Sequence, residues 1–467
     1  MKKILRFVIP ACAVFLLCVA TPTAALAQIF TTLAGFDDTD GAYPTAPLAQ
    51  GLDGNLYGTT SAGGTGPCYK GCGAIFKVTP HGDLTVFYSF CLQSNCVDGE
   101  EPYGGLILAP DGNFYGTTGY GGTYGYGTVF KITPGGLLTT LYSFCAPATC
   151  YDGSIPEAGL VQATDGNFYG TTFLGGVNNW GTVFKISSDG ALTTLHSFDK
   201  VDGSTPYAGL IQATDGNLYG ATSGGGANLV GTVFKITPGG TLTTLNNFGG
   251  SGGAYPNGTL VQATDGYFYG TTTYGGAYNY GTVFKMNAAG LVVTLHSFDG
   301  SDGGAPIGGL VQGTNGTFYG STVGIIYGTI FEITSTGTLT TLHTFDGNAN
   351  AGIEPKAGVV QATNGDFYGT TSFDGYYGFG TVFSLSAALG PFVETVPTVG
   401  RTGSMVIILG NGLTGATSVT FNGTLATFTV ASPTEIKATV PTGATSGKVQ
   451  VTTPHGTLTS NVVFRVK

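Results

Sequence analysis

Tryptophan, histidine and positively charged side chains are scarce in this chain, and the shortage narrows what it can do. The 467 residues include one Trp, five His and 16 Lys or Arg, and charged residues make up 9% of the chain. So little positive charge excludes the basic surfaces that bind nucleic acid or anionic membranes. The H-E-x-x-H motif and the P-loop are also missing. Their absence excludes a metalloprotease of the H-E-x-x-H type and a nucleotide-binding protein of the P-loop type.

Long apolar runs are limited to one, from Phe7 to Ala20. Three basic residues precede it, and Ala25-Leu26-Ala27 follows it. The run is too short for an ordinary transmembrane helix. A basic start, an apolar centre and an Ala-x-Ala end are typical of a secretory signal peptide. We therefore expect residues 1–27 to be a signal peptide and the mature protein to have no transmembrane segment. It would be secreted to the extracellular space or cell surface, with the periplasm as an alternative.

Negative charge dominates the larger part of the expected mature chain. Residues 28–390 carry 8 Lys or Arg against 24 Asp or Glu, whereas residues 391–467 carry 5 against 2. An acidic surface is a further argument against nucleic acid as a partner. The change in composition after Gly390 divides the chain into a long first part and a short second one.

The first part is organised around a repeat. The stretch from Gly159 to Ala208 returns almost unchanged from Gly209 and in looser form through most of the chain. A Tyr-Gly pair marks seven units, at Tyr57, Tyr115, Tyr169, Tyr219, Tyr269, Tyr319 and Tyr368. A Gly-x-x-Phe motif follows it each time, from Gly73, Gly127, Gly181, Gly231, Gly281, Gly328 and Gly380. Periods of roughly 20–50 residues are typical of solenoids and propellers.

Each unit contains four β-prone runs separated by turn residues. In the unit that begins at Gly159, the runs cover residues 159–164, 167–172, 181–187 and 191–198. Asp165-Gly166 joins the first two, and Asp-Gly between β-prone runs is a strong hairpin signal. Val, Ile, Thr, Tyr and Phe dominate the runs, and no helical periodicity is present. Four short antiparallel strands per unit predict a propeller blade.

The two ends of the repeat region predict how it closes. The seventh unit stops at residues 380–386 without a fourth strand, and residues 29–36 (IFTTLAGF) match the missing strand in register. We therefore predict an all-β protein: a seven-bladed β-propeller closed by its N-terminal strand, over residues 28–390. An open array of β-units is the alternative, but it would carry atypical capping repeats.

Six cysteines in the repeat region lie in three close pairs. They are Cys68 and Cys72, Cys91 and Cys96, and Cys145 and Cys150. In an exported protein, local disulfides are the natural interpretation. Metal binding is the alternative, but no His lies near any pair. We expect three disulfides, no metal site and no cofactor.

The second part, residues 391–467, has strand-like runs separated by Gly, Pro and Asn, which predicts a compact β-sandwich. It is similar to the IPT/TIG immunoglobulin-like domain, through Pro397-Thr398, Gly400 and residues 406–412 and 419–423. Such domains occur in cell-surface receptors and as spacers in some extracellular carbohydrate enzymes.

The repeat region, over about residues 36–390, resembles the GloVer tandem-repeat extracellular proteins of bacteria. The resemblance rests on units of the form GLVQATDGNFYGTT…GTVFKITPGG, which recur seven times. It implies an exported, propeller-like array and no defined reaction.

If the first run of each unit is innermost, the connections after the second and fourth runs share one face of the propeller. These connections are longer and more variable than the tight turns opposite, and loops on a rigid scaffold carry function. Aromatic rings beside amides suit sugar recognition, so the candidate ligand-binding residues are Tyr124, Tyr126, Asn178, Asn179, Trp180, Tyr278, Tyr280, Tyr376 and Tyr377. Alternatively, the aromatic residue before each Gly-x-x-Phe seals one blade against the next.

The Asp of Asp-Gly-x-x-Pro recurs in the connections after the fourth run, at Asp40, Asp98, Asp152, Asp202 and Asp302. A ring of carboxylates could line a polar pore or bind a cation, but Asp-Gly also starts a β-turn. His196, His296 and His343 recur at one position, held elsewhere by tyrosine, asparagine or alanine, which indicates packing rather than catalysis.

We therefore expect no catalytic residues and a secreted, non-catalytic protein that binds a glycan or a cell-surface protein, as a monomer. A carbohydrate-active enzyme is the first alternative, since paired acids from different blades could form a glycosidase site. Its least implausible acids are Glu100, Glu101 and Glu157. A purely structural component of the cell envelope is the second.

Overall fold

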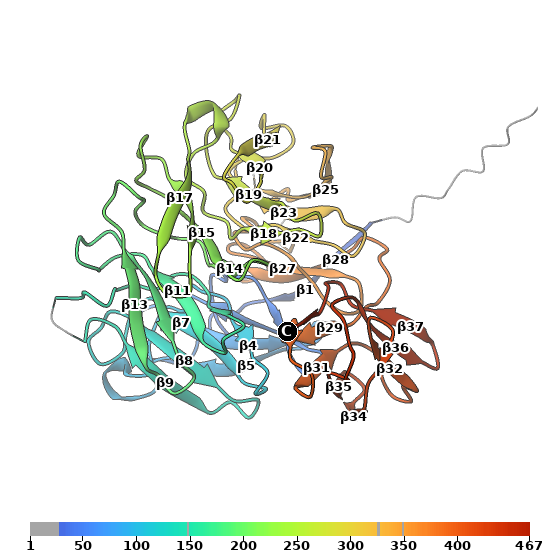
Figure 1. The fold of residues 1–467 in the computed structure, drawn as a ribbon. Helices are drawn as coiled ribbons and strands as arrows, with labels where there is room; N and C mark the ends of the chain where they lie inside the picture. Colours follow the sequence, from blue (N-terminus) through green and yellow to red (C-terminus); the bar gives the residue numbers. More distant parts are fainter. Residues whose placement is uncertain (1–27, 147–148, 325–326, 348–349) are drawn as a thin grey trace, which may run out of the picture.

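The structure is a computed structural model that describes residues 28–146, 149–324, 327–347 and 350–467 (Figure 1). The expected signal peptide, residues 1–27, lies outside the described residues. The fold is all-β, and the helical elements in the described part are two single 3-10 turns, η1 (Ser94–Cys96) and η2 (Gly250–Gly252). No helix there is long and apolar enough to cross a membrane.

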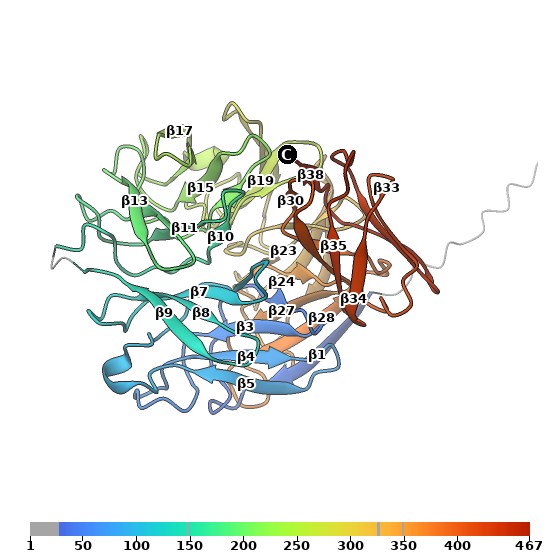
Figure 2. The same ribbon diagram turned by 60° about the horizontal axis from the view of Figure 1, so that its bottom comes forward.

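The repeats fold as four-stranded antiparallel sheets arranged like propeller blades (Figures 1 and 2). The first three are β2 (Ala49–Gln50), β3 (Leu56–Thr60), β4 (Ala74–Val78), β5 (Leu84–Ser89); β6 (Ile107–Leu108), β7 (Phe114–Thr118), β8 (Thr128–Ile132), β9 (Leu138–Ser143); β10 (Val161–Gln162), β11 (Phe168–Thr172), β12 (Thr182–Ile186), β13 (Leu192–Ser197). The next three are β14 (Ile211–Gln212), β15 (Leu218–Thr222), β16 (Thr232–Ile236), β17 (Leu242–Asn247); β18 (Val261–Gln262), β19 (Phe268–Thr272), β20 (Thr282–Met286), β21 (Val292–Ser297); β22 (Val311–Gln312), β23 (Phe318–Thr322), β24 (Thr329–Ile333), β25 (Leu339–Thr344).

The last repeat sheet contains strands from both ends of the repeat region. Its order is β1-β28-β27-β26, formed by β1 (Ile29–Gly35), β28 (Thr381–Ser386), β27 (Phe367–Thr371) and β26 (Val360–Gln361). β1 runs antiparallel to β28, with Ile29 opposite Ser386 and Gly35 opposite Thr381. Figure 1 shows blue β1 beside orange β28. The pairing that the sequence predicts between residues 29–36 and 380–386 is therefore present.

The apolar core lies between successive blades. One cluster, for example, joins Tyr169, Val183 and Phe198 of one blade to Phe234 and Ile236 of the next, all of them buried. The tyrosine of the second strand also stacks on the neighbouring blade where an aromatic side chain faces it, as Tyr219 does on Phe268 at 4.2 Å between ring centroids. Each blade thus buries its apolar faces against its two neighbours, which a single blade cannot do.

Backbone hydrogen bonds repeat the same joint at every blade boundary. The N–H of the residue before each repeat proline donates to the carbonyl before the Gly-x-x-Phe glycine of the preceding blade. The seven bonds measure 2.8–3.0 Å and run from Glu101 to Cys72, Ile155 to Tyr126, Thr205 to Trp180, Tyr255 to Val230, Ala305 to Tyr280, Glu354 to Tyr327 and Tyr43 to Phe379. The last of them joins the sheet β1-β28-β27-β26 to the sheet β2-β3-β4-β5.

The Gly-x-x-Phe glycine has a steric role at this joint. Gly181 has a φ of +94°, and a Cβ there would lie 2.4 Å from the Thr172 carbonyl oxygen and 2.6 Å from Cδ of Pro206. A left-handed backbone with no room for a side chain requires glycine. At the equivalent Gly380, a Cβ would lie 2.3 Å from the Thr371 carbonyl oxygen and 3.0 Å from Cδ of Pro44 in the first blade.

A second set of bonds joins the blades at their other end. A glutamine of one blade accepts a hydrogen bond from a threonine N–H of the preceding blade, as Gln262 does from Thr214 at 2.8 Å. Gln50 accepts the equivalent bond from Thr363 at 2.9 Å, across the junction between the first and last blades. The same contacts therefore occur at this junction as between blades that are continuous in sequence.

Residues 391–467 form two four-stranded sheets around one apolar core. The strands are β29 (Glu394–Val396), β31 (Met405–Leu409), β35 (Glu435–Thr439) and β34 (Phe428–Ser432) in one sheet, and β33 (Thr424–Leu425), β32 (Ser418–Phe421), β36 (Val449–Thr453) and β37 (Gly456–Thr459) in the other. A two-stranded pair, β30 (Val399–Gly400) and β38 (Arg465–Val466), completes this C-terminal module. Val406, Ile436, Val451 and Phe464 are buried in its core.

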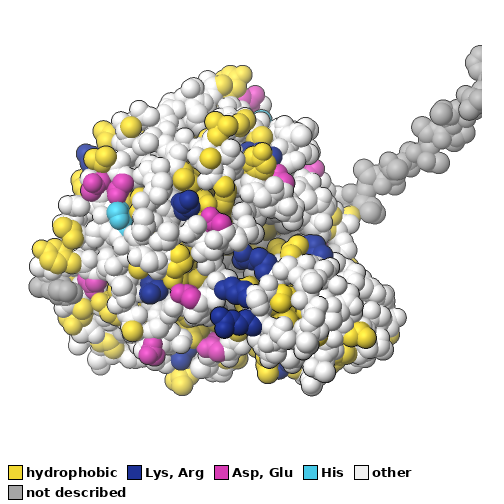
Figure 3. All heavy atoms as spheres, viewed as in Figure 1, with side chains coloured by type: hydrophobic (Ala, Val, Ile, Leu, Met, Phe, Trp, Pro, Cys, Tyr) yellow, Lys and Arg dark blue, Asp and Glu magenta, His cyan; other side chains and the backbone are white. Residues whose placement is uncertain are grey.

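The C-terminal module rests on the face of the repeat region that carries the tight turns. Thr434 Oγ1 donates to the Leu52 carbonyl at 2.7 Å, and Phe392 N–H donates to the Thr363 carbonyl at 3.0 Å. At the turn between β10 and β11, Lys467 Nζ donates to the Thr164 carbonyl at 3.3 Å. Lys and Arg side chains gather where the module meets the sheets (Figure 3). In the part of the chain that the structure describes, the hydrogen bonds between the module and the sheets all lie on this face.

Candidate functional site: the loop face and the axial cavity

The connections after the second and fourth strands share the face away from the C-terminal module, called here the loop face. Short antiparallel bridges tie the two kinds of connection together within neighbouring blades, such as Ser204 with Gly224 and Ala254 with Tyr274. The same architecture therefore presents variable loops from every blade on one surface. This is the surface on which the sequence placed the candidate ligand-binding residues.

The loop tyrosines among these candidates are exposed. They are Tyr124, Tyr126, Tyr278, Tyr280, Tyr376 and Tyr377. Tyr376 is 75% exposed and Tyr377 56%, and their rings meet edge to face at 4.8 Å. Within the described residues, this is the one ring contact between members of the candidate set. The structure thus offers one aromatic pair and several separate rings rather than a single aromatic cluster.

The other three candidates make contacts inside their own loop and blade. Asn178 Nδ2 donates to the Phe198 carbonyl at 3.2 Å, and Asn179 Oδ1 accepts from Gly175 N–H at 3.0 Å. Trp180 is half-buried against the core between two blades, with Lys200 Nζ 5.3 Å from its ring centre. The packing of Trp180 supports the alternative that the position before Gly-x-x-Phe seals the blades in this unit, whereas Tyr126 and Tyr280 at the same position are exposed.

All three predicted disulfides are formed. Cys68 is bonded to Cys72, Cys91 to Cys96 and Cys145 to Cys150. Cross-links this local mainly restrict the loops that contain them. The sequence prediction of local pairs is therefore confirmed.

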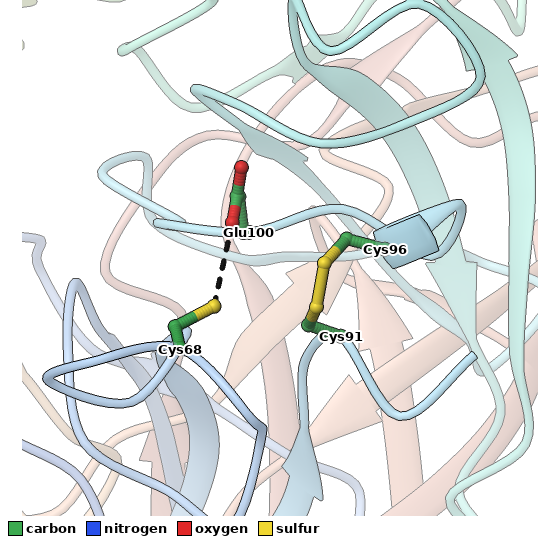
Figure 4. A group of neighbouring side chains, drawn as sticks. All are labelled: Cys68, Cys91, Cys96 and Glu100. Atoms are coloured by element: carbon green, nitrogen blue, oxygen red, sulfur yellow. Dashed lines mark hydrogen bonds between the residues drawn. A yellow bond between two sulfur atoms is a disulfide. The ribbon is translucent and has the colours of Figure 1, made fainter. Parts of the chain in front are cut away.

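The Cys91–Cys96 disulfide lies close to Cys68 and to the Glu100 carboxylate on the loop face (Figure 4). Ligand atoms of Cys68, Cys91, Cys96 and Glu100 lie within 4.8 Å of one another, and Cys68 Sγ is 3.4 Å from Glu100 Oε2. A metal would need thiolates, whereas these sulfurs are bonded in disulfides. The group therefore fits a cross-linked loop pair better than a metal centre.

The repeated Asp-Gly-x-x-Pro aspartates have partners that the sequence did not suggest. Asp202 Oδ2 lies 2.7 Å from His196 Nε2, and Asp302 Oδ2 lies 2.6 Å from His296 Nε2. Tyr88 and Tyr142 donate to Asp98 and Asp152, each at 2.8 Å. The carboxylates therefore brace the fourth strand of their own blade and do not line the axial cavity.

The two blades that lack this Asp also lack the usual arrangement. Gly252 replaces it where Asn246 replaces the His or Tyr, and Ala351 replaces it beside His343. His343 Nε2 is buried with no hydrogen-bond partner among the described residues, and burial lowers the pKa of this imidazole. In β1, Ala34 stands at the position of the His or Tyr, so Asp40 lacks that hydrogen-bond partner. Burial raises the pKa of the Asp40 carboxyl to about 6.

A cavity of about 340 Å³ lies on the propeller axis. Its walls are the residues that lead into the innermost strands, and it contains the residue that follows each repeat proline. These seven mouth positions are Thr45, Tyr103, Glu157, Tyr207, Asn257, Ile307 and Lys356. Deeper positions are mostly Ala and Gly, then Leu or Val. Volumes of roughly 300–1,000 Å³ are usual for small-molecule sites.

Glu157 is the acid of the cavity mouth. Burial raises the pKa of its carboxyl to about 7. Burial also raises the pKa of the Tyr207 phenol, with the Glu157 charge as a further cause. The sequence analysis named Glu157 as a candidate acid, but only the arrangement of the blades places it near tyrosines from two neighbouring blades.

Glu100 and Glu101 lie on the same side of the ring as Glu157. Glu101 Oε2 accepts from the Tyr103 hydroxyl at 2.5 Å, and burial followed by the Glu101 charge raises the pKa of the Glu100 carboxyl.

One Gly-x-Ser-x-Gly sequence lies at residues 249–253, in a loop at η2. A catalytic serine elbow would instead lie between a strand and a helix.

Comparison with known proteins identifies the two parts of the chain. Residues 21–163 and 146–326 match the Gloeobacter/Verrucomicrobia repeat, and residues 392–466 match the IPT/TIG domain. A search of curated proteins gave no match.

Solved structures resemble the chain in fold at low identity. One is the extracellular domain of a hybrid two-component system from B. thetaiotaomicron, with a TM-score of 0.53, 12% identity, and 91% of this chain and 51% of that chain covered. The present chain therefore spans about half the length of that structure. Others are a 6-phosphogluconolactonase from Bacteroides fragilis (TM-score 0.43, 18% identity, 71% and 94% covered) and a protein from Lactobacillus plantarum (0.45, 16%, 83% and 97%).

The first likeness supports a propeller-type fold, and identities this low carry no activity or ligand across. The repeat profile, in contrast, matches well over half of the residues. The chain belongs to the Gloeobacter/Verrucomicrobia repeat family.

Proposed function

We propose that this chain is an exported, non-catalytic binding protein, in which a closed seven-bladed propeller presents a ligand-binding loop face and an immunoglobulin-like module occupies the other face. The ligand is a glycan or a cell-surface protein. The observation that carries the proposal is the set of exposed loop tyrosines, with Tyr376 and Tyr377 in contact, on the face that the module leaves uncovered. Exposed rings on a rigid scaffold stack against sugar faces or protein side chains and lose little entropy on binding.

Closure of the ring is part of this proposal. Its support is the pairing of β1 with β28 and the two hydrogen bonds, Tyr43 to Phe379 and Thr363 to Gln50, that repeat the bonding of the other blade boundaries. Closed rings leave no long unpaired sheet edge. A closed ring also keeps all the variable loops on a common surface.

Export is supported by the three disulfides. Structural disulfides persist in oxidising compartments and are rare in the cytosol. The likeness to an extracellular domain agrees with this location. The protein then meets glycans and surface proteins, which are the partners proposed.

The test is a glycan array and a surface-protein binding screen with the full chain and two variants. Tyr376→Ala/Tyr377→Ala removes the exposed pair, and Tyr267→Ala removes a tyrosine that is 41% exposed in a tight turn on the opposite face. We expect the double variant to lose binding by tenfold or more and Tyr267→Ala to bind normally. No binding by any of the three proteins would favour a structural role in the cell envelope.

A carbohydrate-active enzyme is the second candidate, because burial raises the pKa of the Glu157 carboxyl to about 7, a value suited to a general acid at neutral pH. Incubation with polysaccharides and a reducing-end assay tests it. Product that disappears in Glu157→Gln would replace the binding proposal by this one.

A further inference from the structure

Sequence variation around the propeller axis is greatest at one position of the repeat. The seven mouth positions carry six different residue types, whereas the residue after each of them is always Ala or Gly. The wall residues are held by the fold: Thr117 Oγ1, for example, donates to the Ala158 carbonyl of the next blade at 2.9 Å. The mouth residues also line the cavity, but the side-chain contacts they make in the described part of the chain stay within one blade or connection: Tyr103 with Glu101, Asn257 with Thr273 and Lys356 with Glu354. Constant wall residues around variable mouth residues are the arrangement expected of a ligand-binding site.

We propose that the axial cavity is a binding site for small ligands that carry an ammonium group, held by the Glu157 carboxylate between Tyr103 and Tyr207. This goes beyond the binding proposed for the exposed loop tyrosines, which lie at the loop tips. Either proposal can therefore fail while the other stands.

The first argument is the unmatched carboxylate. Within the described part of the chain, no hydrogen-bond donor and no cation contacts Glu157, although the side chain lies in the cavity wall. A partly buried carboxylate without a partner is costly, and cationic ligands are its natural counter-charge. Glu101, in contrast, already accepts a bond from Tyr103.

The second argument is the position of the one basic residue at the mouth. Lys356 Nζ lies 3.2 Å from Glu354 Oε2 and 4.6 Å from the Phe373 ring centre. Its charge is therefore matched at the rim, within its own blade, and it does not neutralise Glu157. The Glu157 carboxylate therefore remains available to bind a cationic ligand in the cavity.

The third argument is the aromatic setting. Tyr103 and Tyr207 precede and follow Glu157 around the ring, and the Glu157 charge adds to burial in raising the pKa of both phenols. Ammonium groups are attracted to aromatic faces and gain roughly 0.5–2 kcal/mol from each such contact. A carboxylate flanked by two tyrosines thus favours an alkylammonium ion over an anion or a neutral sugar.

The experiment is isothermal titration of the full mature chain at pH 8, where a carboxyl with a pKa of about 7 is ionised. The ligands are choline, ethanolamine and 3,3-dimethyl-1-butanol, the uncharged carbon analogue of choline. We expect choline or ethanolamine to bind, and the neutral analogue to bind at least tenfold more weakly than choline. Glu157→Gln should weaken the binding of the cation tenfold or more, and Tyr207→Ala should weaken it several-fold. Glu332→Gln, which makes the same change on strand β24 away from the cavity, should bind as the parent chain does.

Melting temperatures of the variants establish that each is folded. Absence of binding by both cations would overturn the proposal. Equal binding by the parent chain and Glu157→Gln would also overturn it, as would binding of the neutral analogue as strong as that of choline. None of these results depends on glycan binding by the Tyr376/Tyr377 pair.

Discussion

The two faces of the propeller are built from the same repeat and differ in what the repeat fixes. On the tight-turn face, Asp165 accepts bonds from Asn167 N–H and the Tyr169 hydroxyl, and the same pattern recurs at Asp111 and Asp215. On the loop face the backbone joints repeat equally well, but the loop tips and mouth positions change from blade to blade. Residues that carry structure are constant, and those that face solvent or the axis are free to serve binding.

The C-terminal module sharpens this difference. It binds carbonyl groups of the constant tight turns, including those of Leu52 and Thr164. These acceptors exist in every blade, so the module needs no special residue of the repeat. The variable face remains available for a partner.

The largest expected effect comes from removing the strand that puts the loops on a common face. Deleting residues 28–36 should make the repeat region unfold without one cooperative transition. The reason is that β28 loses its partner strand and the core loses the Phe36 side chain. Phe36→Ala alone should cost about 4 kcal/mol. Thermal unfolding followed by circular dichroism measures both, and Ile29→Ala, at an exposed position, is the control.

The second prediction compares one substitution on the two faces. Gly181→Ala and Gly166→Ala both place alanine at positive φ, at +94° and +87°, but only the Cβ at Gly181 meets other atoms. Gly181→Ala should cost about 4 kcal/mol, and Gly166→Ala about 1 kcal/mol from backbone strain alone. Chemical denaturation gives the two free energies of unfolding. Equal costs would show that the joint on the loop face is not as tight as described.

The third prediction concerns pH. The pKa of the Glu157 carboxyl rises from its ordinary value of 4.5 to about 7 on folding. A raised carboxyl pKa means that the folded state holds the proton more tightly, so this group's contribution is fully present below pH 4.5 and is lost as pH rises towards 7. Glu157→Gln should therefore stabilise the ligand-free protein by about 3 kcal/mol at pH 8 and by little at pH 4.5. Denaturation curves at the two pH values test this, and a gain that is equal at both would contradict it.

The smallest effect on stability is expected at the loop tips. Tyr376→Ala/Tyr377→Ala should change the free energy of unfolding by less than about 1 kcal/mol, because both side chains are exposed. If ligand binding is lost in a variant that melts normally, the loop face carries the binding. A large loss of stability would instead give the pair a structural role.

Much of the fold could be predicted because the same strand and turn pattern recurs in seven sequence units. Asp165-Gly166 is a turn, and residues 29–36 supply the strand that the seventh unit lacks, both visible as local pattern. The disulfides could be predicted because each pair is only a few residues apart, as with Cys145 and Cys150.

The site was less accessible to sequence reasoning, because its residues meet through the ring. His196 and Asp202 were each noticed as repeated positions, but not as partners. The paired replacement of both, by Asn246 with Gly252, was the signal that could have joined them. Each mouth position follows a proline in a connecting loop, and only the arrangement of the blades shows that these residues line one cavity. Asn178 and Asn179 looked free to bind, but the fold of their loop engages both side chains.

The loops of all blades share a face, and the mouth positions surround one cavity, only if the two ends of the repeat region form one sheet. Hydrogen–deuterium exchange tests this without altering the chain. We predict that amides of residues 29–35 are protected to the same degree as those of Leu192–Ser197, the equivalent strand inside a continuous repeat. Exchange of residues 29–35 at the rate of an unstructured peptide would contradict the closed ring and the axial site with it.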